Sequence, residues 1–311
     1  MRRAPTSAVI DSLFINSNPN EVWTKAADIV SLINPAYDFL FSKTTFDDVV
    51  RLFCGKYPGY CAIKTLYHDL PHTLDVFICA VRLMHGVHLS GTHLSDEEMT
   101  MIMMASLMHD IGYAQLHGEE TGTGAQHTKD HVNRGIEFMK RYIDYRRFPH
   151  EFSTTLELII RCTDIAVSIS DINFPKERVR LLGQIVRTAD LTGQMASRTY
   201  LEKLLFLYLE FEEARLGNYK DVHDLLRKTH KFYKITQQKL DGELGSIYSK
   251  LAFHFKDSFG VENNYYMKSI EKNIAYLSKV TLLNDTRHLS MLKREGIVEK
   301  VKGLIDTEEP T

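Results

Sequence analysis

Apolar positions recur every three or four residues along most of the chain, which is the spacing of amphipathic α-helices. The stretch after Asn18 is typical, because Pro19 suits a first helical turn and an apolar stripe then runs from Trp23 through Ala26 and Ile29. We find no convincing two-residue alternation of the kind that marks β-strands, and no internal repeat. The pattern therefore predicts an all-α fold, a compact bundle of many helices.

One predicted helix is too apolar for a surface position. It begins at the capping box Ser95–Glu98, runs through Met99 to Met108, and ends in the adjacent pair His109-Asp110. A buried imidazole and carboxylate are costly unless something compensates them, and a divalent cation is a common compensation. The alternative is an ordinary surface His-Asp pair at a helix end.

Histidines are concentrated near this helix, since nine of the 14 fall between His68 and His131. His72 lies in the first turn of a helix that follows Pro71, and His68 lies just before that turn; the alternative is two solvated cap histidines. His127 and His131 are four residues apart and share a helix face. We expect His85, His88 and His93 to be solvated in a loop-like run.

Two further features stand near the predicted site. Asp190 directly follows a buried apolar helix face, where an unpaired carboxylate is again expensive. Residues 114–126 are rich in glycine and threonine and form a candidate lid.

Composition is that of an ordinary globular protein, with 311 residues, 44% hydrophobic and 25% charged, and a net charge of -2. The near-neutral charge gives no case for nucleic acid as a partner, and the apolar runs are too short to cross a membrane. The N-terminus lacks a signal-peptide pattern, and four scattered cysteines fit a reducing, cytoplasmic location. A monomer and a homodimer both remain open.

Five short motifs, in order, resemble those of HD-domain metal phosphohydrolases, and most closely those of class I cyclic-nucleotide phosphodiesterases. They are Tyr67-His68-Asp69-x-x-His72, His109-Asp110 with His131-x-x-x-Gly135, Cys162-Thr163-Asp164, Thr188-Ala189-Asp190, and Glu210-Phe211 followed by Leu216-Gly217-Asn218. The resemblance covers roughly residues 60 to 250. It implies N-terminal helices over residues 1–60, an HD catalytic core over 61–220 and pocket-closing helices over 221–300. These would form one structural domain, with a frayed tail over 301–311.

The resemblance also implies roles. Two divalent ions, of zinc, iron, manganese or magnesium, would activate water to cleave a nucleotide-like phosphodiester or another phosphate ester. The first ion would be held by His72, His109, Asp110 and Asp190, and Asp110 would bridge to the second. His68 would act as general acid. His131, Thr163 and Asp164 would hold the second ion or its waters, whereas His127 would be either a direct ligand or a supporting group.

Substrate recognition departs from the resembled family, because the purine-clamping glutamine motif is absent. Glu243 stands nearest that position, and it could equally be a solvated charge. Tyr67, Tyr248 and Phe255 are candidate substrate contacts, but aromatic rings also fill cores. The enzyme prediction is therefore a phosphodiesterase, with a nucleotide phosphomonoesterase or a non-catalytic HD sensor or scaffold as alternatives.

Overall fold

A computed structural model describes residues 13–14 and 17–308, with side chains described through residue 304. Apart from an isolated antiparallel bridge between Tyr60 and Leu116, the regular structure in these residues is helical, which confirms the all-α prediction. The α-helices are α2 (Pro19–Ile33), α3 (Leu40–Phe53), α4 (Leu70–Leu89), α5 (Asp96–Met108), α6 (His131–Arg146), α7 (Glu151–Arg161), α8 (Glu177–Ala196), α9 (Tyr200–Glu213), α10 (Val222–Asp241), α11 (Leu251–Phe259), α12 (Tyr265–Thr281), α13 (Asp285–Met291) and α14 (Ile297–Glu308). Short 3₁₀ turns are η1 (Ile111–Tyr113), η2 (Ala125–His127), η3 (Ile169–Asp171), η4 (Ile247–Lys250) and η5 (Arg294–Gly296).

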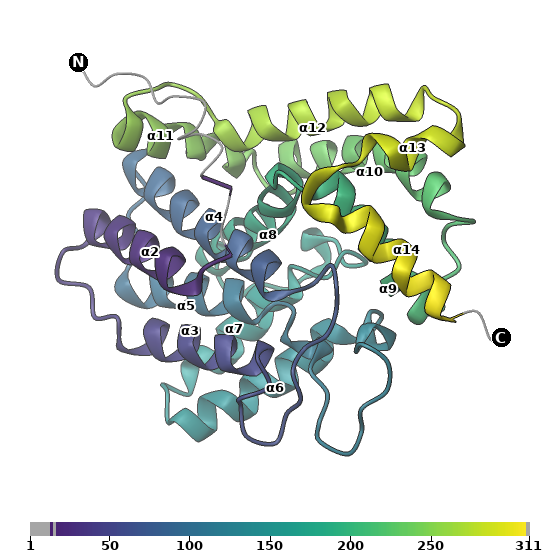
Figure 1. Cartoon of the computed structure of the whole chain (residues 1–311). Coiled ribbons are helices and arrows are strands. Elements are labelled where there is room, and N and C mark those ends of the chain that lie inside the picture. The colour runs from purple at the N-terminus through teal and green to yellow at the C-terminus, as the bar shows by residue number, and fades with distance from the viewer. Residues whose placement is uncertain (1–12, 15–16, 309–311) are drawn as a thin grey trace.

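Helix α4 lies at the centre of the bundle (Figure 1) and packs against α2, α5, α8 and α11. Its start follows from local sequence, because the Asp69 carboxylate accepts a hydrogen bond from the His72 amide at 2.8 Å and Pro71 occupies the first turn. The first turn is therefore defined by side chains within three residues of the helix start. This orients His72 toward α5.

Helix α5 is buried along its whole length after the first turn, as the sequence predicted. Ser95 and Glu98 form the expected capping box, and Met99 through Met108 are all buried. Because α3, α7 and α8 surround α5, its C-terminal end delivers His109 and Asp110 into the interior rather than to solvent.

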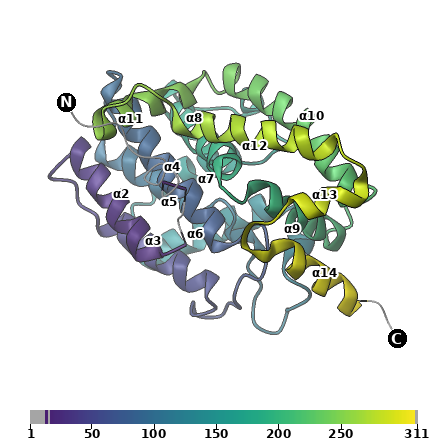
Figure 2. The same cartoon turned by 45° about the horizontal axis from the view of Figure 1, so that its top comes forward.

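The C-terminal helices form a further layer (Figure 2), in which α12 packs on α8 and α10 packs on α9 and α12. One large hydrophobic cluster draws buried residues from Leu13 through Val301, so all three predicted segments contribute to it. The expected fraying of residues 301–311 stays a prediction, although the chain is helical in α14 as far as Glu308. Its apolar residues Ile297, Val298 and Val301 are buried, and the helix packs against α9. Residues 309–311 and most of the N-terminal stretch considered above for a signal peptide lie outside the described part of the chain.

The expectation of a solvated histidine loop also needs correction. Helix α4 extends to Leu89, so His85 and His88 are helical, and His85 is buried beside His254 of α11. The apolar side chains around His85 keep this turn in the core. Within residues 13–14 and 17–308, none of the helices has the length and apolar character needed to cross a membrane.

Candidate metal centre

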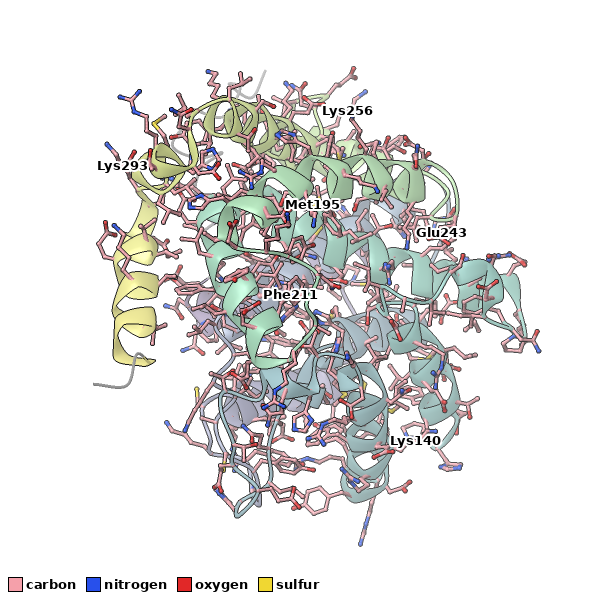
Figure 3. The ribbon with its side chains drawn as sticks, turned by 90° about the vertical axis from the view of Figure 1, so that its right-hand side faces the viewer. Lys140, Met195, Phe211, Glu243, Lys256 and Lys293 are labelled. Carbon is pink, nitrogen blue, oxygen red and sulfur yellow. The ribbon has the colours of Figure 1, made fainter. Side chains whose placement is uncertain are left out.

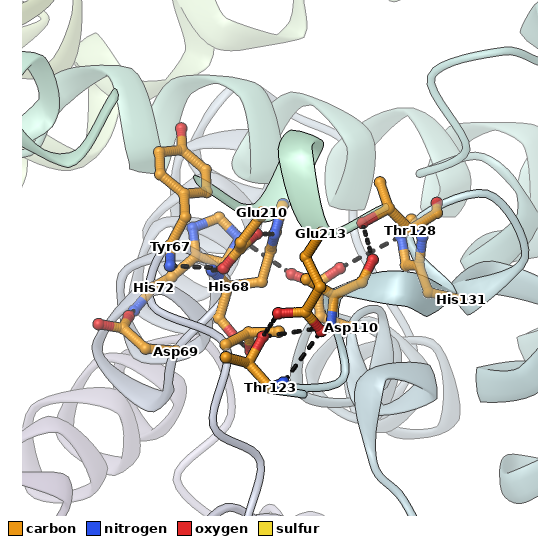
Figure 4. Close-up of polar contacts among 12 residues, drawn as sticks. Tyr67, His68, Asp69, His72, Asp110, Thr123, Thr128, His131, Glu210 and Glu213 are labelled. Carbon is orange, nitrogen blue, oxygen red and sulfur yellow. Dashed lines mark hydrogen bonds and ion pairs between the residues drawn. The ribbon is translucent and has the colours of Figure 1, made fainter. Parts of the chain in front are cut away.

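Three predicted ligands from two helix ends converge on one point. The Nε2 atoms of His72 and His109 lie 3.3 Å apart, and each is about 3 Å from Oδ2 of Asp110, at 3.1 and 3.0 Å. All three side chains are buried. Figure 4 shows Asp110 between the His72 side and the His131 side of this cluster. The structure thus brings together the first three residues of the predicted ligand set.

Backbone carbonyls fix the orientation of the His109 and His131 imidazoles through their Nδ1 atoms. Nδ1 of His109 lies 2.9 Å from the Ser106 carbonyl, and Nδ1 of His131 lies 2.8 Å from the Thr128 carbonyl. A carbonyl can only accept, so each Nδ1 donates, and Nε2 is the nitrogen of each ring that faces Asp110. This arrangement is typical of metal-binding histidines, whose second nitrogen is held by a backbone carbonyl.

The buried carboxylate of Asp110 is not satisfied by hydrogen bonds. Its Oδ2 atom is buried and has no hydrogen-bond partner, although it faces two imidazole nitrogens. Burial opposes ionisation of both partners, but their mutual attraction wins. The pKa of His109 rises to about 9 through the charge of Asp110, and the pKa of Asp110 falls well below its usual range. The cluster therefore favours an added positive charge, which a proton or a divalent cation could supply.

Asp190 of α8 lies beside the two histidines of this cluster. Its Oδ1 atom lies 3.9 Å from Nε2 of His72 and 3.8 Å from Nε2 of His109, too far for hydrogen bonds. Donor atoms that share one cation at about 2.0–2.2 Å stand roughly 3–4 Å from one another. The His72, His109 and Asp110 atoms are thus spaced for a shared ion, whereas Asp190 lies outside the group whose donor atoms all come within 4.8 Å of one another.

His131 lies on the opposite side of Asp110, with its Nε2 atom 3.5 Å from Oδ1. This approach depends on Gly112, because a Cβ atom there would lie 1.8 Å from the His131 carbonyl oxygen. Arg134 also joins α6 to the turn after Asp110, donating to the carbonyls of Gly112 and Ala114 at 2.8 Å each. Oδ2 of Asp110 therefore faces His72 and His109, whereas Oδ1 faces His131.

His68 stands beside the cluster and is held by Glu210, a residue whose role the sequence did not reveal. Nδ1 of His68 lies 2.6 Å from Oε2 of Glu210, whose Oε1 accepts from the Tyr67 amide at 2.7 Å (Figure 4). Burial lowers the pKa of His68, but the negative charges of Glu210 and Asp110 outweigh it and raise the pKa to about 9. A buried glutamate on the inner face of α9 was the sequence signal that could have indicated this pair.

The other predicted second-ion residues make local contacts. Thr163 donates to the Ile160 carbonyl at 2.7 Å, and Asp164 accepts from the Ala166 amide at 2.9 Å. His127 is partly buried, with its Nδ1 atom 3.8 Å from Asp130. The observed contacts of these three residues place none of them against Asp110, so their role stays a prediction.

The predicted substrate contacts separate into two groups. Tyr67 lies at the site, where its hydroxyl donates to Gln194 of α8. Glu243 instead accepts from the Ser168 hydroxyl at 2.6 Å and the Ile169 amide at 3.1 Å, and Figure 3 shows it at the edge of the bundle, well to the side of Phe211 on α9. Tyr248 donates to Asp241 at 2.7 Å, and Phe255 is fully buried. These last two positions favour the core and surface alternatives over base stacking.

Comparison with known proteins gives limited information. A family model described as Npun_R2479-like matches residues 115–241, which include His131, Asp190 and Glu210 but not His72 or His109-Asp110. No curated protein matches the chain.

Proposed function

We propose that this chain is a metal-dependent phosphohydrolase of the HD-domain type that cleaves a phosphate ester, most favourably a phosphodiester of the cyclic-nucleotide kind. The observation that carries the proposal is the buried Oδ2 atom of Asp110, which lacks a hydrogen-bond partner among the imidazoles of His72 and His109. Natural proteins rarely leave such an atom unsatisfied without a functional reason. The ordered motifs of the sequence point to the same chemistry.

The donor set fits a divalent transition metal. Two imidazole nitrogens and two carboxylate oxygens, from His72, His109, Asp110 and Asp190, suit zinc, iron or manganese. His131 and the outer oxygen of Asp110 offer a start for a second site. When bound, such cations supply a lowered pKa for attacking water and offset the charge that develops on phosphoryl oxygens.

The protein's own residues supply the remaining steps. Glu210 holds His68 by its Nδ1 atom, which leaves Nε2 of the protonated imidazole free to donate. In the proposed reaction this proton passes to the leaving alkoxide oxygen as its bond to phosphorus breaks. The ring of His68 is stacked on Tyr113, with centroids 4.9 Å apart, which restricts its rotation.

A nucleotide phosphomonoesterase is the second candidate, and one observation favours it. Glu243, the nearest counterpart of a purine clamp, is already engaged by Ser168 and Ile169. Because Ser168 and Ile169 already hydrogen-bond this carboxylate, Glu243 gives no support for tight recognition of a cyclic-nucleotide base. The same metal cluster would serve either substrate class.

The test combines metal analysis with a hydrolysis screen. Purified protein is reconstituted separately with Zn²⁺, Mn²⁺ and Fe²⁺, then assayed on cyclic nucleotides, linear nucleotides and bis(p-nitrophenyl) phosphate. Release of nucleoside monophosphate from a cyclic nucleotide supports the phosphodiesterase, and release of inorganic phosphate supports the phosphomonoesterase. Metal binding without turnover on any substrate would instead favour a non-catalytic sensor or scaffold.

A further inference from the structure

A second cluster of potential ligands lies in two loops, one before α4 that contains Cys61 and one after η1 that contains His117 and Glu120. Sγ of Cys61 lies 3.0 Å from Nδ1 of His117 and 2.8 Å from Oε1 of Glu120, and the imidazole and carboxylate atoms are 3.7 Å apart. One sulfur, one nitrogen and one oxygen donor therefore face a common point. None of these residues belongs to the cluster around Asp110.

The backbone holds these loops in register. An antiparallel bridge joins Tyr60 to Leu116, the Cys61 amide donates to the Gln115 carbonyl at 2.9 Å, and the His117 amide donates to Gly59 at 3.1 Å. In this register Cys61 lies opposite Gln115 and His117 lies opposite Gly59, so Cys61 and His117 are diagonal neighbours across the bridge. Backbone hydrogen bonds at Cys61 and His117 thus fix the main chain at both residues, so their side chains are held near each other by the backbone.

Glu120 is fixed as well. Its second oxygen, Oε2, accepts a hydrogen bond from the Gly118 amide at 2.9 Å, while Oε1 faces Cys61. Gly118 adopts a positive φ of 90°, which lets the chain turn so that the carboxylate comes back over the sulfur. One carboxylate oxygen is therefore oriented as a ligand and the other as its support.

We propose that Cys61, His117 and Glu120 bind one zinc-class divalent cation, with water or another small ligand in the remaining position. Thiolate and imidazole select borderline cations such as Zn²⁺ over Mg²⁺ or Ca²⁺. Three protein ligands and an open fourth position form a recurrent arrangement for zinc. His117 and Glu120 are largely exposed, so a cation has a direct path of entry.

The geometry does not suit a nucleophilic cysteine. A base that activates a thiol needs one ring nitrogen for the sulfur and the other for an orienting acid. Here the sulfur and the Glu120 carboxylate both face Nδ1 of His117. The Cys61 thiol also donates a hydrogen bond to Oε1 of Glu120 at 2.8 Å and not to His117, which does not present the sulfur as a nucleophile.

With a cation bound, the Cys61 sulfur, the His117 nitrogen and the Glu120 carboxylate would no longer compete for one another, because all three could face the same positive charge. The Cys61 thiol releases its proton to solvent as its sulfur forms a bond to the cation, and the carboxylate of Glu120 then faces a positive charge. The bound ion would join residues 59–61 to residues 115–120. The lid loop would then be held at both ends, because Glu213 of α9 already binds the Thr123 amide at 2.9 Å and its hydroxyl at 2.7 Å (Figure 4).

Cobalt(II) provides a probe that separates this site from the other one. A thiolate ligand gives Co²⁺ an intense near-ultraviolet charge-transfer absorption, and the His72–His109–Asp110–Asp190 set contains no sulfur. Titration of the metal-free full chain with Co²⁺ should produce this band with a stoichiometry of one, and Zn²⁺ should abolish it by displacement. Cys61→Ser should remove the band and weaken binding at this site by about a hundredfold or more, beyond the loss typical of a supporting residue.

Matched variants decide the outcome. Cys54→Ser removes an exposed thiol elsewhere and should leave the band intact, as should Asp110→Asn. His117→Ala and Glu120→Gln should each weaken Co²⁺ binding while circular dichroism stays unchanged. Absence of the band in the wild-type protein, or its persistence in Cys61→Ser, would overturn the proposal. Since no activity assay enters the test, its result is independent of the phosphohydrolase proposal.

Discussion

The Oε2 atom of Glu210 lies 2.6 Å from Nδ1 of His68, so a buried carboxylate on α9 holds an imidazole at the entrance of α4. The same carboxylate accepts the backbone amide of Tyr67. Because both oxygens are used, Glu210 fixes the orientation of His68 through Nδ1, and Nε2 is the nitrogen that Glu210 does not hold. Two predictions follow directly from this pair.

Replacing His68 with alanine should lower turnover of alkyl phosphate esters by roughly 10²–10⁴-fold, the usual contribution of a general acid. An aryl ester with a good leaving group needs no proton and should lose much less. Metal content should not change. Steady-state kinetics on one alkyl and one aryl substrate, with elemental analysis, measure both effects, and equal losses on the two substrates would contradict the role.

Glu210→Gln tests the positioning of His68 without removing it. The glutamine can still accept from the Tyr67 amide, but it no longer presents a charged acceptor to His68. We expect kcat on the alkyl ester to fall about tenfold or more, less than in His68→Ala, with little change in KM. Glu212→Gln, on the same helix, is the control. A loss in KM alone would show that Glu210 shapes the binding site instead.

Binding of metal at Asp110 should stabilise the fold. A cation at a hundred times its Kd adds about 2.7 kcal/mol to the free energy of unfolding. Mn²⁺ is the appropriate probe, because it binds thiolate poorly and so avoids Cys61. Wild-type protein should melt at a higher temperature with Mn²⁺, whereas Asp110→Ala should show no shift. An equal rise in both proteins would remove Asp110 from the ligand set.

The local parts of this structure were predictable from sequence. The caps of α4 and α5 depend on side chains within three residues of the helix start, namely Asp69 with His72 and Ser95 with Glu98. The ends of these helices then place His72, His109 and Asp110 in the interior. Capping and apolar periodicity are short-range signals, so a single sequence contains them.

Contacts across the bundle were not predictable in the same way. His68 and Glu210 are separated by 142 residues, and His85 meets His254 across 169 residues. Such pairs depend on how the segment before α4 lies against α9 and on how α4 packs against α11, which periodicity does not specify. The contact of Glu243 with Ser168, 75 residues away, belongs to the same class of long-range pairs.

Base specificity should be weak. Glu243 is the residue nearest the expected purine clamp in sequence, yet Ser168 and Ile169 already occupy its carboxylate. Without an edge-reading group, adenine and guanine substrates should differ by less than about tenfold in kcat/KM, or about 1.4 kcal/mol. Side-by-side kinetics on cyclic AMP and cyclic GMP provide the measurement. A preference of about a hundredfold would mean that another residue reads the base.

The buried pair of His85 and His254 should make the fold sensitive to acid. Their Nδ1 atoms lie 3.0 Å apart, so one ring donates and the other accepts, and at most one of the two rings can be protonated while this hydrogen bond persists. Burial lowers the pKa of both rings, and the nearby charge of Arg82 helps to hold that of His254 well below its usual range. The unfolded chain, with an ordinary histidine pKa of about 6.5, therefore binds more protons than the folded chain below that pH.

Consequently, the free energy of unfolding should fall as the pH drops below about 6.5, by up to about 1.4 kcal/mol per pH unit for each histidine. His254→Asn keeps a hydrogen-bonding group near the Nδ1 position but does not titrate, so the slope should become shallower. His150→Asn is the matched control, since the His150 side chain is 90% exposed and should leave the slope unchanged. Urea unfolding between about pH 5 and pH 8 covers the range in which ordinary histidines titrate. Identical slopes in His254→Asn and the wild type would show that the acid sensitivity arises from other groups.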